Sequence, residues 1–353
     1  MSSVELGRAC AVSGRAGYRS DRAWAELYQA AQRAETRMSG NYNDNVRVDT
    51  PGGPVLVRIP VRRADQMDLR VWAECDVVRV VSRHVDHVPR LLHVSCDPPF
   101  QIHEFVTGRQ LNEVAPRGTR VPPNVIPDVV NLFCRLATIR PGELPPLPSG
   151  WPEEGRSSDF GRMLSEVTQR VFDENQREFG ALFRAFGIPD DPLAAVVAAW
   201  PAMKPRPFRA VHADVHRQNM LMSPRGVVFL DWELALWGDP VYDLAVHVHK
   251  MTYLDHELAR LLSDWKSAAE PSAIRSWPQD LTAYLRHERV KSAIVDSVRY
   301  PREIVADGTT EARRELLTDK LTGKLNLAGQ IWGWRTSLCA DEVDSLITGW
   351  AAG

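Results

Sequence analysis

The sequence predicts an α+β fold of two lobes, a small antiparallel β-rich lobe followed by a larger α-helical lobe. Short apolar runs separated by turn residues fill the first hundred residues, whereas apolar residues at helical spacing dominate the rest of the chain. Two Pro-rich stretches, 116–127 and 141–152, mark the transition. We therefore predict an N-terminal lobe over residues 1–107 and a C-terminal lobe over 108–353.

The first lobe is predicted to contain a helix, a β-hairpin, a second helix and two further strands. The hairpin is the clearest element, because a Pro-Gly-Gly turn at 51–53 joins two runs rich in β-branched residues. In chain order we expect a helix at 20–37, strands at 46–49 and 55–59, a helix at 65–83, and strands at 90–95 and 100–106.

The second lobe is predicted to be helical apart from one short hairpin. Its strands, 220–222 and 227–230, are joined by a Ser-Pro-Arg-Gly turn. Helices are expected at 128–139, at 156–187 as one long or two short helices, and at 192–200, 255–268, 278–299, 309–331 and 340–350.

Length and composition exclude several classes of protein. With 353 residues, 44% of them hydrophobic, the chain can bury a substantial core. A formal net charge of −2 argues against a nucleic-acid partner. No apolar run reaches the roughly 18 residues of a membrane span, and the first residues lack the apolar part of a signal peptide. We therefore expect no membrane partner and a cytoplasmic location. The five cysteines are widely spaced, which argues against a disulfide framework or a cysteine metal site.

Polar residues of a catalytic type gather in one segment, which runs FRAVHADVHRQNMLMSPRGVVFLDWELALWGDPVYDLAV from Phe208 to Val246. Pairing the two strands of its hairpin brings Asn219, just before the first strand, beside Asp231, just after the second. An amide oxygen beside a carboxylate suits Mg²⁺, which takes few protein oxygens together with substrate phosphates and water. We predict Asn219 and Asp231 as metal ligands and Asp214 as the catalytic residue that faces a substrate hydroxyl.

Three neighbouring residues have structural interpretations as well. The ring of His212 is expected to bond to the backbone near the metal-binding turn. The carboxylate of Asp243 is expected to accept backbone amides of the catalytic loop. Glu233 is left with two interpretations, a contact with the metal or a structural acid.

The segment resembles the catalytic loop of phosphoryl-transfer enzymes with the bilobal protein-kinase-like fold, in which one Asp handles the acceptor hydroxyl while Asn and a second Asp hold metal. More closely, it resembles the aminoglycoside phosphotransferase and choline kinase-like superfamily, whose usual pattern is HGDLHxxN, DWE and GDPxxDLA. The resemblance covers roughly residues 35–250. Ala213 stands where the family usually has Gly, a change expected to be sterically minor, and Arg58 stands where many members have Lys.

The resemblance also implies a nucleotide site in the first lobe. SGNYNDNVRV resembles the nucleotide loop of the family, VLVRIP its phosphate-binding strand, and FQIHEFVTG the linker whose backbone meets the nucleobase. No lysine precedes Lys204, so Arg58 is the well-placed cation for the phosphates, with Glu74 as its ion-pair partner and with Arg47 and Arg62 as the nearest substitutes. The expected nucleotide-binding residues are Ser39, Gly40, Asn43, Arg58, Glu74, His103, Glu104 and Phe105.

The resulting hypothesis is a Mg²⁺-dependent phosphotransferase that moves the γ-phosphate of ATP or GTP to a hydroxyl of a small molecule. An antibiotic is the first choice of substrate, in resistance or self-resistance. A metabolic kinase for an amino alcohol or a sugar is the alternative, and a non-catalytic nucleotide-binding pseudokinase is the third. Between 241 and 353 the chain has 16 acidic and 14 basic residues, a near balance that favours a less cationic, ring-bearing acceptor over a polycation.

Overall fold

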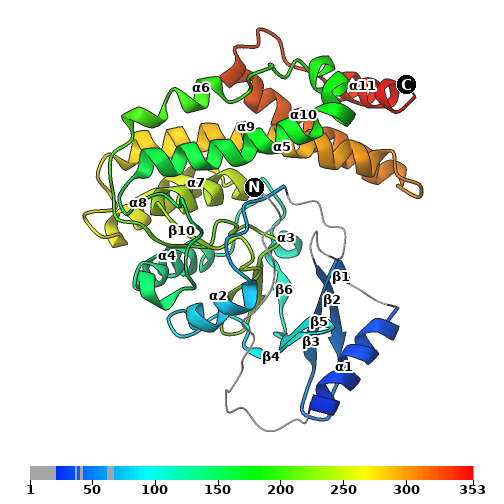
Figure 1. Cartoon of the computed structure of the whole chain (residues 1–353), viewed down its shortest axis with the longest axis vertical. Coiled ribbons are helices and arrows are strands. Elements are labelled where there is room, and N and C mark those ends of the chain that lie inside the picture. Colours follow the sequence, from blue (N-terminus) through cyan, green and yellow to red (C-terminus); the bar gives the residue numbers. More distant parts are fainter. Residues whose placement is uncertain (1–20, 36–37, 40–42, 62–66, 353) are drawn as a thin grey trace.

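The computed structural model describes residues 21–35, 38–39, 43–61 and 67–352. It confirms the two-lobed α+β fold (Figure 1). A small lobe of antiparallel strands, here the N-lobe, lies beside a larger lobe of long helices, here the C-lobe. None of the helices in the described part is both long enough and apolar enough to span a membrane.

The N-lobe is built on a five-stranded antiparallel sheet in the order β1-β2-β3-β5-β4. Its strands are β1 (Met38–Ser39), β2 (Asn43–Val48), β3 (Val55–Pro60), β4 (Leu91–Cys96) and β5 (Pro99–Glu104). Helix α1 (Asp21–Arg33) covers one face, where the Tyr28 and Phe100 rings stack at 4.7 Å over the buried side chains of Val46 and Val57. The predicted hairpin at 51–53 is confirmed as the β2–β3 connection.

The predicted helix at 65–83 is wrong in its first half. Residues 65 and 66 lie outside the described part, and 67–73 are not helical; helix α2 comprises only Glu74–Val81. The segment 67–73 reaches the C-lobe instead, because Asp68 pairs with Arg299 at 2.8 Å and Arg70 pairs with Glu233. These contacts with distant residues outweigh the helical spacing of the local sequence.

The C-lobe contains a small sheet and a set of packed helices. Its sheet has the order β6-β8-β9, and a second pair joins β10 to β7. The strands are β6 (Arg109–Gln110), β7 (Arg209–Val211), β8 (Met220–Ser223), β9 (Gly226–Phe229) and β10 (Leu236–Gly238). Residues 105–108 connect the two lobes, since β5 belongs to the large sheet and β6 pairs with β8. The division into 1–107 and 108–353 stays our proposal.

The helices of the C-lobe are α3 (Leu111–Val114), α4 (Val125–Leu136), α5 (Ser157–Ala185), α6 (Ala194–Val197), α7 (Pro240–Met251), α8 (Asp255–Ala268), α9 (Trp277–Ile304), α10 (Glu311–Trp332) and α11 (Ala340–Ala352). The segment 156–187 is one long helix, α5. The predicted helix at 192–200 is largely wrong: it shrinks to the single turn of α6, and a 3₁₀ turn follows at 200–202, where Pro201 lies. Helix α7, which the sequence analysis did not predict, follows the GDP motif directly.

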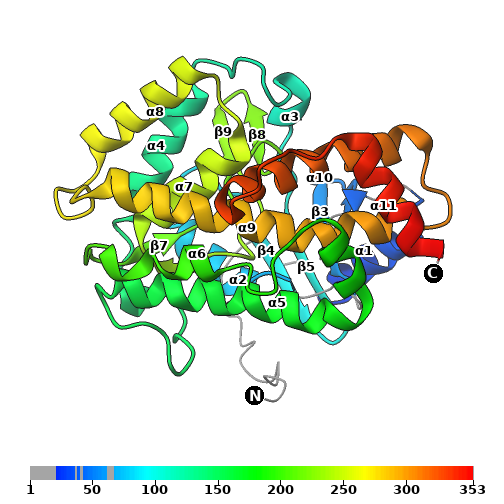
Figure 2. The ribbon, with the colours of Figure 1, turned by 90° about the horizontal axis from the view of Figure 1, so that it is seen from above.

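Helix α9 runs through the middle of the C-lobe and packs against α5, α7 and α10 (Figure 2). Where α5 and α9 meet, the fully buried Trp200 ring lies beside Tyr284 at 5.5 Å and donates its Nε1–H to Ser165 at 2.9 Å. The Trp200 ring can lie this close to α5 because residue 161 of that helix is a glycine, which has no side chain under the ring. These packed helices thus form the buried core of the C-lobe.

We predict that Gly161→Ala destabilises the C-lobe. An added Cβ would lie 2.6 Å from ring atoms of Trp200, whose position is fixed by burial and by its bond to Ser165. Overpacking of this kind costs about 1–3 kcal/mol, which urea unfolding of the purified variant would measure. Gly349→Ala in α11 is the matched control, since nothing lies within 4 Å of its added Cβ. An equally small effect of both changes would contradict the packing argument.

Candidate active site

The loop after β7 is fixed by a carboxylate from α7. The backbone amides of His212 and Ala213 donate to the two carboxylate oxygens of Asp243, at 2.9 and 2.8 Å. Asp243 is buried, and burial raises its pKa to about 7 despite the two amide bonds. Asp243 therefore has the structural role that the sequence analysis expected, and it ties the catalytic loop to the first turn of α7.

His212 ties the same loop to the end of the β8–β9 hairpin. Its Nε2 lies 3.1 Å from the carbonyl oxygen of Leu230, and its ring packs on Trp232 with centroids 4.3 Å apart. Burial lowers the pKa of His212, so the ring is neutral and its Nε2–H donates to the carbonyl. This contact confirms the expected bond between the ring and the backbone.

Two residues of the site have left-handed backbone conformations. Ala213 has φ of 57° and Asp231 has φ of 66°. For a residue with a Cβ this region costs roughly 1–2 kcal/mol, and glycine adopts it readily. The expectation that Ala213 is a minor change from the family's Gly is therefore wrong, since the position has a conformational reason to be Gly.

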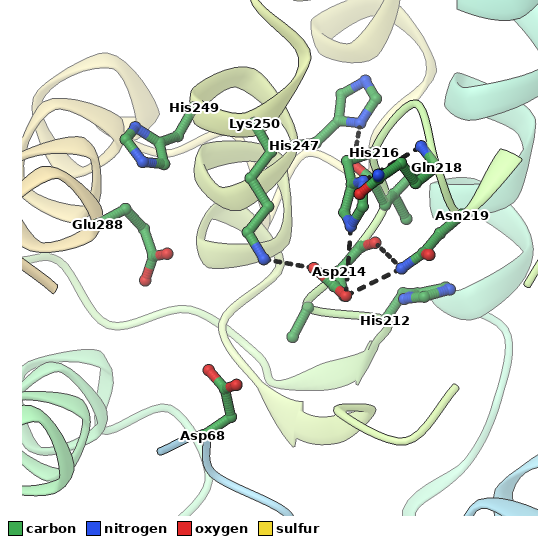
Figure 3. Close-up of polar contacts among 12 residues, drawn as sticks. Asp68, His212, Asp214, His216, Gln218, Asn219, His247, His249, Lys250 and Glu288 are labelled. Atoms are coloured by element: carbon green, nitrogen blue, oxygen red, sulfur yellow. Dashed lines mark hydrogen bonds and ion pairs between the residues drawn. The ribbon is translucent and has the colours of Figure 1, made fainter. Parts of the chain in front are cut away.

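Asp214 lies at the centre of a network of polar contacts (Figure 3). Its Oδ2 accepts from Nδ2 of Asn219 at 2.9 Å and lies 3.5 Å from Nε2 of His216, while its Oδ1 pairs with the ammonium group of Lys250. Burial alone would raise the pKa of Asp214. The charge of Lys250 and, after it, His216 outweigh burial and hold the pKa well below its usual range. The carboxylate is therefore ionised and fixed in orientation.

The partner of Asp214 that sequence reasoning missed is Lys250, in the last turn of α7. It lies seven residues after Asp243, which is two helical turns, so both side chains reach the catalytic loop from the same face of the helix. That spacing, in a chain with only six lysines, was the available signal. Lys250 remains charged, because Asp214 outweighs the effect of burial and raises its pKa.

The hairpin brings Asn219 and Asp231 together as the sequence predicts. Met220 pairs with Phe229, and the amide of Leu230 donates to the carbonyl oxygen of Asn219 at 2.9 Å, so Asp231 follows directly beside it. The Nδ2 of Asn219 is bound to Asp214, which leaves its Oδ1 as a possible ligand.

The acidic groups around Asp231 fit a divalent cation. Burial raises the pKa of Asp231, and the neighbouring carboxylates of Glu74 and Asp214 add to this effect. Burial, followed by Asp231, also raises the pKa of Glu233, to about 8. Within the described residues no three His, Cys, Asp or Glu side chains form a metal-binding group. Mg²⁺ does not need such a group, since it takes one or two protein oxygens together with phosphates and water.

Arg58 on β3 bridges two acids from different parts of the fold. One of its terminal nitrogens, Nη1, pairs with Glu74 on α2, and the other, Nη2, lies 3.1 Å from Asp231. Burial alone would lower the pKa of Arg58, but Glu74 and then Asp231 outweigh it and raise the pKa. The predicted Arg58–Glu74 pair is therefore present, and the bridge to Asp231 adds to it.

The other predicted nucleotide-binding residues are only partly described. Gly40, the alternative cation Arg62 and the side chain of Ser39 lie outside the described residues. Asn43 donates from Nδ2 to Glu233 at 3.4 Å, which places it at the same acidic group as Asp231. Arg47 pairs with Asp49 at 2.9 Å and lies over the ring of Phe105, so its charge is already engaged on the exposed side of β2.

The linker residues His103, Glu104 and Phe105 line the cavity between the lobes. Burial lowers the pKa of His103 to about 3, so this ring is neutral and contacts Gln101. The side chain of Glu104 pairs with Arg90 at 2.9 Å, and its backbone amide donates to the Arg90 carbonyl at 2.8 Å. That amide is therefore engaged within the sheet, and base recognition by this segment would depend on its other backbone groups.

One cavity of about 1450 Å³ connects these groups. The linker and Arg58 of the N-lobe line it together with Asp214 and Asp231 of the C-lobe, and residues of α7, α9 and α10 line the rest. An ionised carboxylate, a buried guanidinium and an amide–carboxylate pair thus face a common space that is large enough for two substrates.

The sequence model of the phosphotransferase enzyme family matches residues 34–277. The chain belongs to this family. It is therefore a small-molecule phosphotransferase, and its kinase family implies a nucleotide as phosphate donor. A search of curated proteins finds no match.

Solved structures show the fold of this phosphotransferase to be kinase-like. A choline/ethanolamine kinase family protein from Mesorhizobium loti has 14% identity and a TM-score of 0.54, over 92% of this chain and 98% of that one. An ethanolamine kinase from Plasmodium vivax has 12% identity and a TM-score of 0.59, over 85% of each chain. The aminoglycoside phosphotransferase APH(4)-Ia has 14% identity and a TM-score of 0.55, over 89% of this chain and 99% of that one.

We predict that Ala213→Gly stabilises the phosphotransferase. The substitution relieves a left-handed backbone while keeping the amide that binds Asp243, so the free energy of unfolding should rise by about 0.5–1 kcal/mol. Urea unfolding measures this change. The control is Ala210→Gly in strand β7, also buried but not among the residues with positive φ, which should lose stability. A loss of stability at both positions would show that strain at Ala213 is not the deciding effect.

Proposed function

We propose that the protein transfers the γ-phosphoryl group of a nucleoside triphosphate to a hydroxyl of a small molecule, with Mg²⁺ as cofactor. The observation that carries the proposal is the arrangement around Asp214, an ionised carboxylate fixed by Asn219 and Lys250 at the junction of the two halves of the cavity. We expect the backbone of the linker, rather than its side chains, to contact the nucleobase. The linker sequence therefore does not discriminate between adenine and guanine, and we propose both ATP and GTP as donors.

In this mechanism Asp214 binds and orients the acceptor hydroxyl and accepts its proton. The new bond forms between the hydroxyl oxygen and the γ-phosphorus while the bond from that phosphorus to the bridging oxygen breaks, and the nucleoside diphosphate leaves with the electron pair. Because Asp214 is ionised, it can accept the proton without prior rearrangement. Lys250 and Asn219 keep its two oxygens in fixed positions, which supports in-line geometry.

The phosphates of the nucleotide would be held by residues on the other side of the cavity from the acceptor hydroxyl. Arg58 would contact the α- and β-phosphates, with Glu74 fixing its orientation. Asn219 Oδ1 and the carboxylate of Asp231 would hold Mg²⁺, which when bound supplies charge neutralisation for the phosphates. Glu233 contacts Arg70 and Asn43, which favours the structural interpretation of this acid over a contact with the metal.

The acceptor remains a hydroxylated small molecule, with an antibiotic as our first proposal and a metabolic amino alcohol or sugar as the second. The similar structures include both kinds, since one is a ternary complex of an aminoglycoside phosphotransferase mutant with ADP and hygromycin B and another is an ethanolamine kinase. A pseudokinase is disfavoured, because the ionised carboxylate of Asp214 lies beside Asn219 and shares one cavity with Asp231, which supports a catalytic arrangement. The cytoplasmic location stays a prediction from the sequence.

A transfer screen tests the proposed function. Purified protein is incubated with Mg²⁺, ATP or GTP and panels of hydroxylated antibiotics, amino alcohols and sugars. Mass spectrometry then reads a gain of about 80 Da on the acceptor, the mass of an added phosphoryl group. The donor preference, the dependence on Mg²⁺ and the acceptor class follow from the same experiment. Transfer to none of the panels, with intact nucleotide binding, would favour the pseudokinase.

We predict that Asp214→Asn lowers turnover by about 10²–10⁴-fold, because the amide cannot accept the hydroxyl proton. Nucleotide affinity should stay nearly unchanged, since Asp214 lies on the acceptor side of Asn219. Steady-state kinetics and calorimetric titration of ADP measure the two effects. Asp264→Asn on α8 is the matched control, a partly exposed carboxylate outside the cavity. Full turnover in Asp214→Asn would remove this residue from the mechanism.

We predict that Arg58→Ala raises the KM for nucleotide and lowers turnover, by about 100-fold in kcat/KM, whereas Arg58→Lys loses about tenfold. The lysine keeps the charge but cannot reach Glu74 and Asp231 with two separate nitrogens, as the guanidinium does. Thermal unfolding of each variant separates loss of folding from loss of function. Arg47→Ala on the adjacent strand is the control. If Arg47→Ala impairs nucleotide binding and Arg58→Ala does not, the assignment of the phosphate-binding strand is wrong.

A further inference from the structure

Four basic side chains line the α10 side of the cavity and are here called the cation patch. Lys320, Lys324 and Arg313 come from α10, and Arg117 comes from the segment after α3. Lys324 pairs with Asp296, and Arg313 pairs with Glu303 at 2.7 Å. Within the described part of the chain, neither Arg117 nor Lys320 has an ion-pair partner within 4 Å. Two more carboxylates, those of Asp319 and Glu113, line the same cavity, and Glu113 lies 3.7 Å from Arg109. The four cations therefore face the three carboxylates of Asp296, Glu303 and Asp319, which leaves the patch with a surplus of one positive charge.

Lys320 shows the effect of this surplus. Its side chain is half-buried on the wall of the cavity. Burial lowers its pKa, and the charges of Arg117, Arg313 and Lys324 lower it further. Like charges held together at the wall of a cavity repel one another, and a bound anion relieves that repulsion.

The catalytic end of the same space is balanced in charge. Lys291 lies 3.9 Å from Asp68 and 3.5 Å from Glu288, and Lys250 is neutralised by Asp214. Figure 3 shows the carboxylates of Asp68 and Glu288 on the other side of Lys250 from Asn219. The surplus positive charge thus belongs to the α10 side of the cavity, whereas the lysines near Asp214 are paired with carboxylates.

We propose that the acceptor of this phosphotransferase carries an anionic group, a carboxylate or a phosphate, that binds the cation patch while its hydroxyl faces Asp214. This inference rests on the proposed function and specifies its substrate class. An acceptor with several ammonium groups would meet like charge at Arg117 and Lys320, which disfavours its binding. The structure therefore favours hydroxy acids and phosphorylated or carboxylated sugars over polyamines.

The test uses three sugars of similar size: glucose 6-phosphate, glucuronate and glucosamine. Each is titrated by calorimetry into the full-length protein saturated with Mg²⁺ and ADP, so that the nucleotide site is already filled. We expect the two anionic sugars to bind more tightly than glucosamine, and their ranking distinguishes a phosphate site from a carboxylate site. Equal binding of the three, including no binding, or a preference for glucosamine overturns the proposal.

A pair of charge reversals locates the site. Lys320→Glu should weaken the anionic sugars by about tenfold or more, because it replaces a charge-assisted contact by repulsion. Lys266→Glu makes the same change on α8, outside the cavity, and should leave their binding unchanged. Equal effects of the two variants, or none, would overturn the assignment to the cation patch. Thermal unfolding confirms that both variants fold.

The failure of this proposal can be distinguished from a failure of the proposed function. Loss of ADP binding or of phosphoryl transfer in every panel contradicts the proposed function. Intact ADP binding together with transfer to polyamines but not to anionic acceptors contradicts only the substrate class. The comparison of Lys320→Glu with Lys266→Glu is made with and without ADP, so its result does not depend on the nucleotide site.

Discussion

The bridge formed by Arg58 joins three parts of the chain that are far apart in sequence. The side chain of Arg58 extends from β3 in the N-lobe, and its guanidinium group binds Glu74 at the start of α2 and Asp231 after the C-lobe hairpin. Arg58 and Glu74 are buried, whereas the side chain of Asp231 is about one-third exposed. Removing the guanidinium would therefore leave the buried carboxylate of Glu74 without its charged partner, which is destabilising. The positions of β3, of the start of α2 and of the turn at Asp231 therefore depend on one another.

The loop that carries Asp214 depends on a second set of contacts, made through its backbone. Asp243 accepts the amides of His212 and Ala213, and the His212 ring binds the carbonyl of Leu230. These contacts force Ala213 into a conformation that it would otherwise avoid. Strain held by surrounding hydrogen bonds is common at functional sites, where it keeps a reacting group oriented. Here it presents Asp214 to the cavity.

Local sequence patterns predicted much of the fold and the candidate site. The hairpins β2–β3 and β8–β9 follow from strand alternation around short turns, and the second hairpin placed Asn219 beside Asp231. Features that depend on distant residues were not predictable in this way. The segment 67–73 is held by α9 and by Glu233, and the helical spacing of the sequence gives no sign of that. The contact between Lys250 and Asp214 needs the packing of α7 on the catalytic loop. The roles of the predicted nucleotide and metal ligands stay predictions.

The ion pairs of segment 67–73 have a consequence for the catalytic cycle. Asp68 and Arg70 precede α2 but bind the C-lobe, so a hinge motion that separates the lobes must stretch this segment or break its ion pairs. Dissolved salt screens attraction between exposed charges, and it acts on these pairs mainly through their partly exposed arginines, Arg70 and Arg299, because Asp68 and Glu233 are largely buried. The cleft should therefore open faster as ionic strength rises. Where opening limits turnover, as it does in many enzymes that close over their substrates, salt would accelerate product departure and leave the chemical step unchanged.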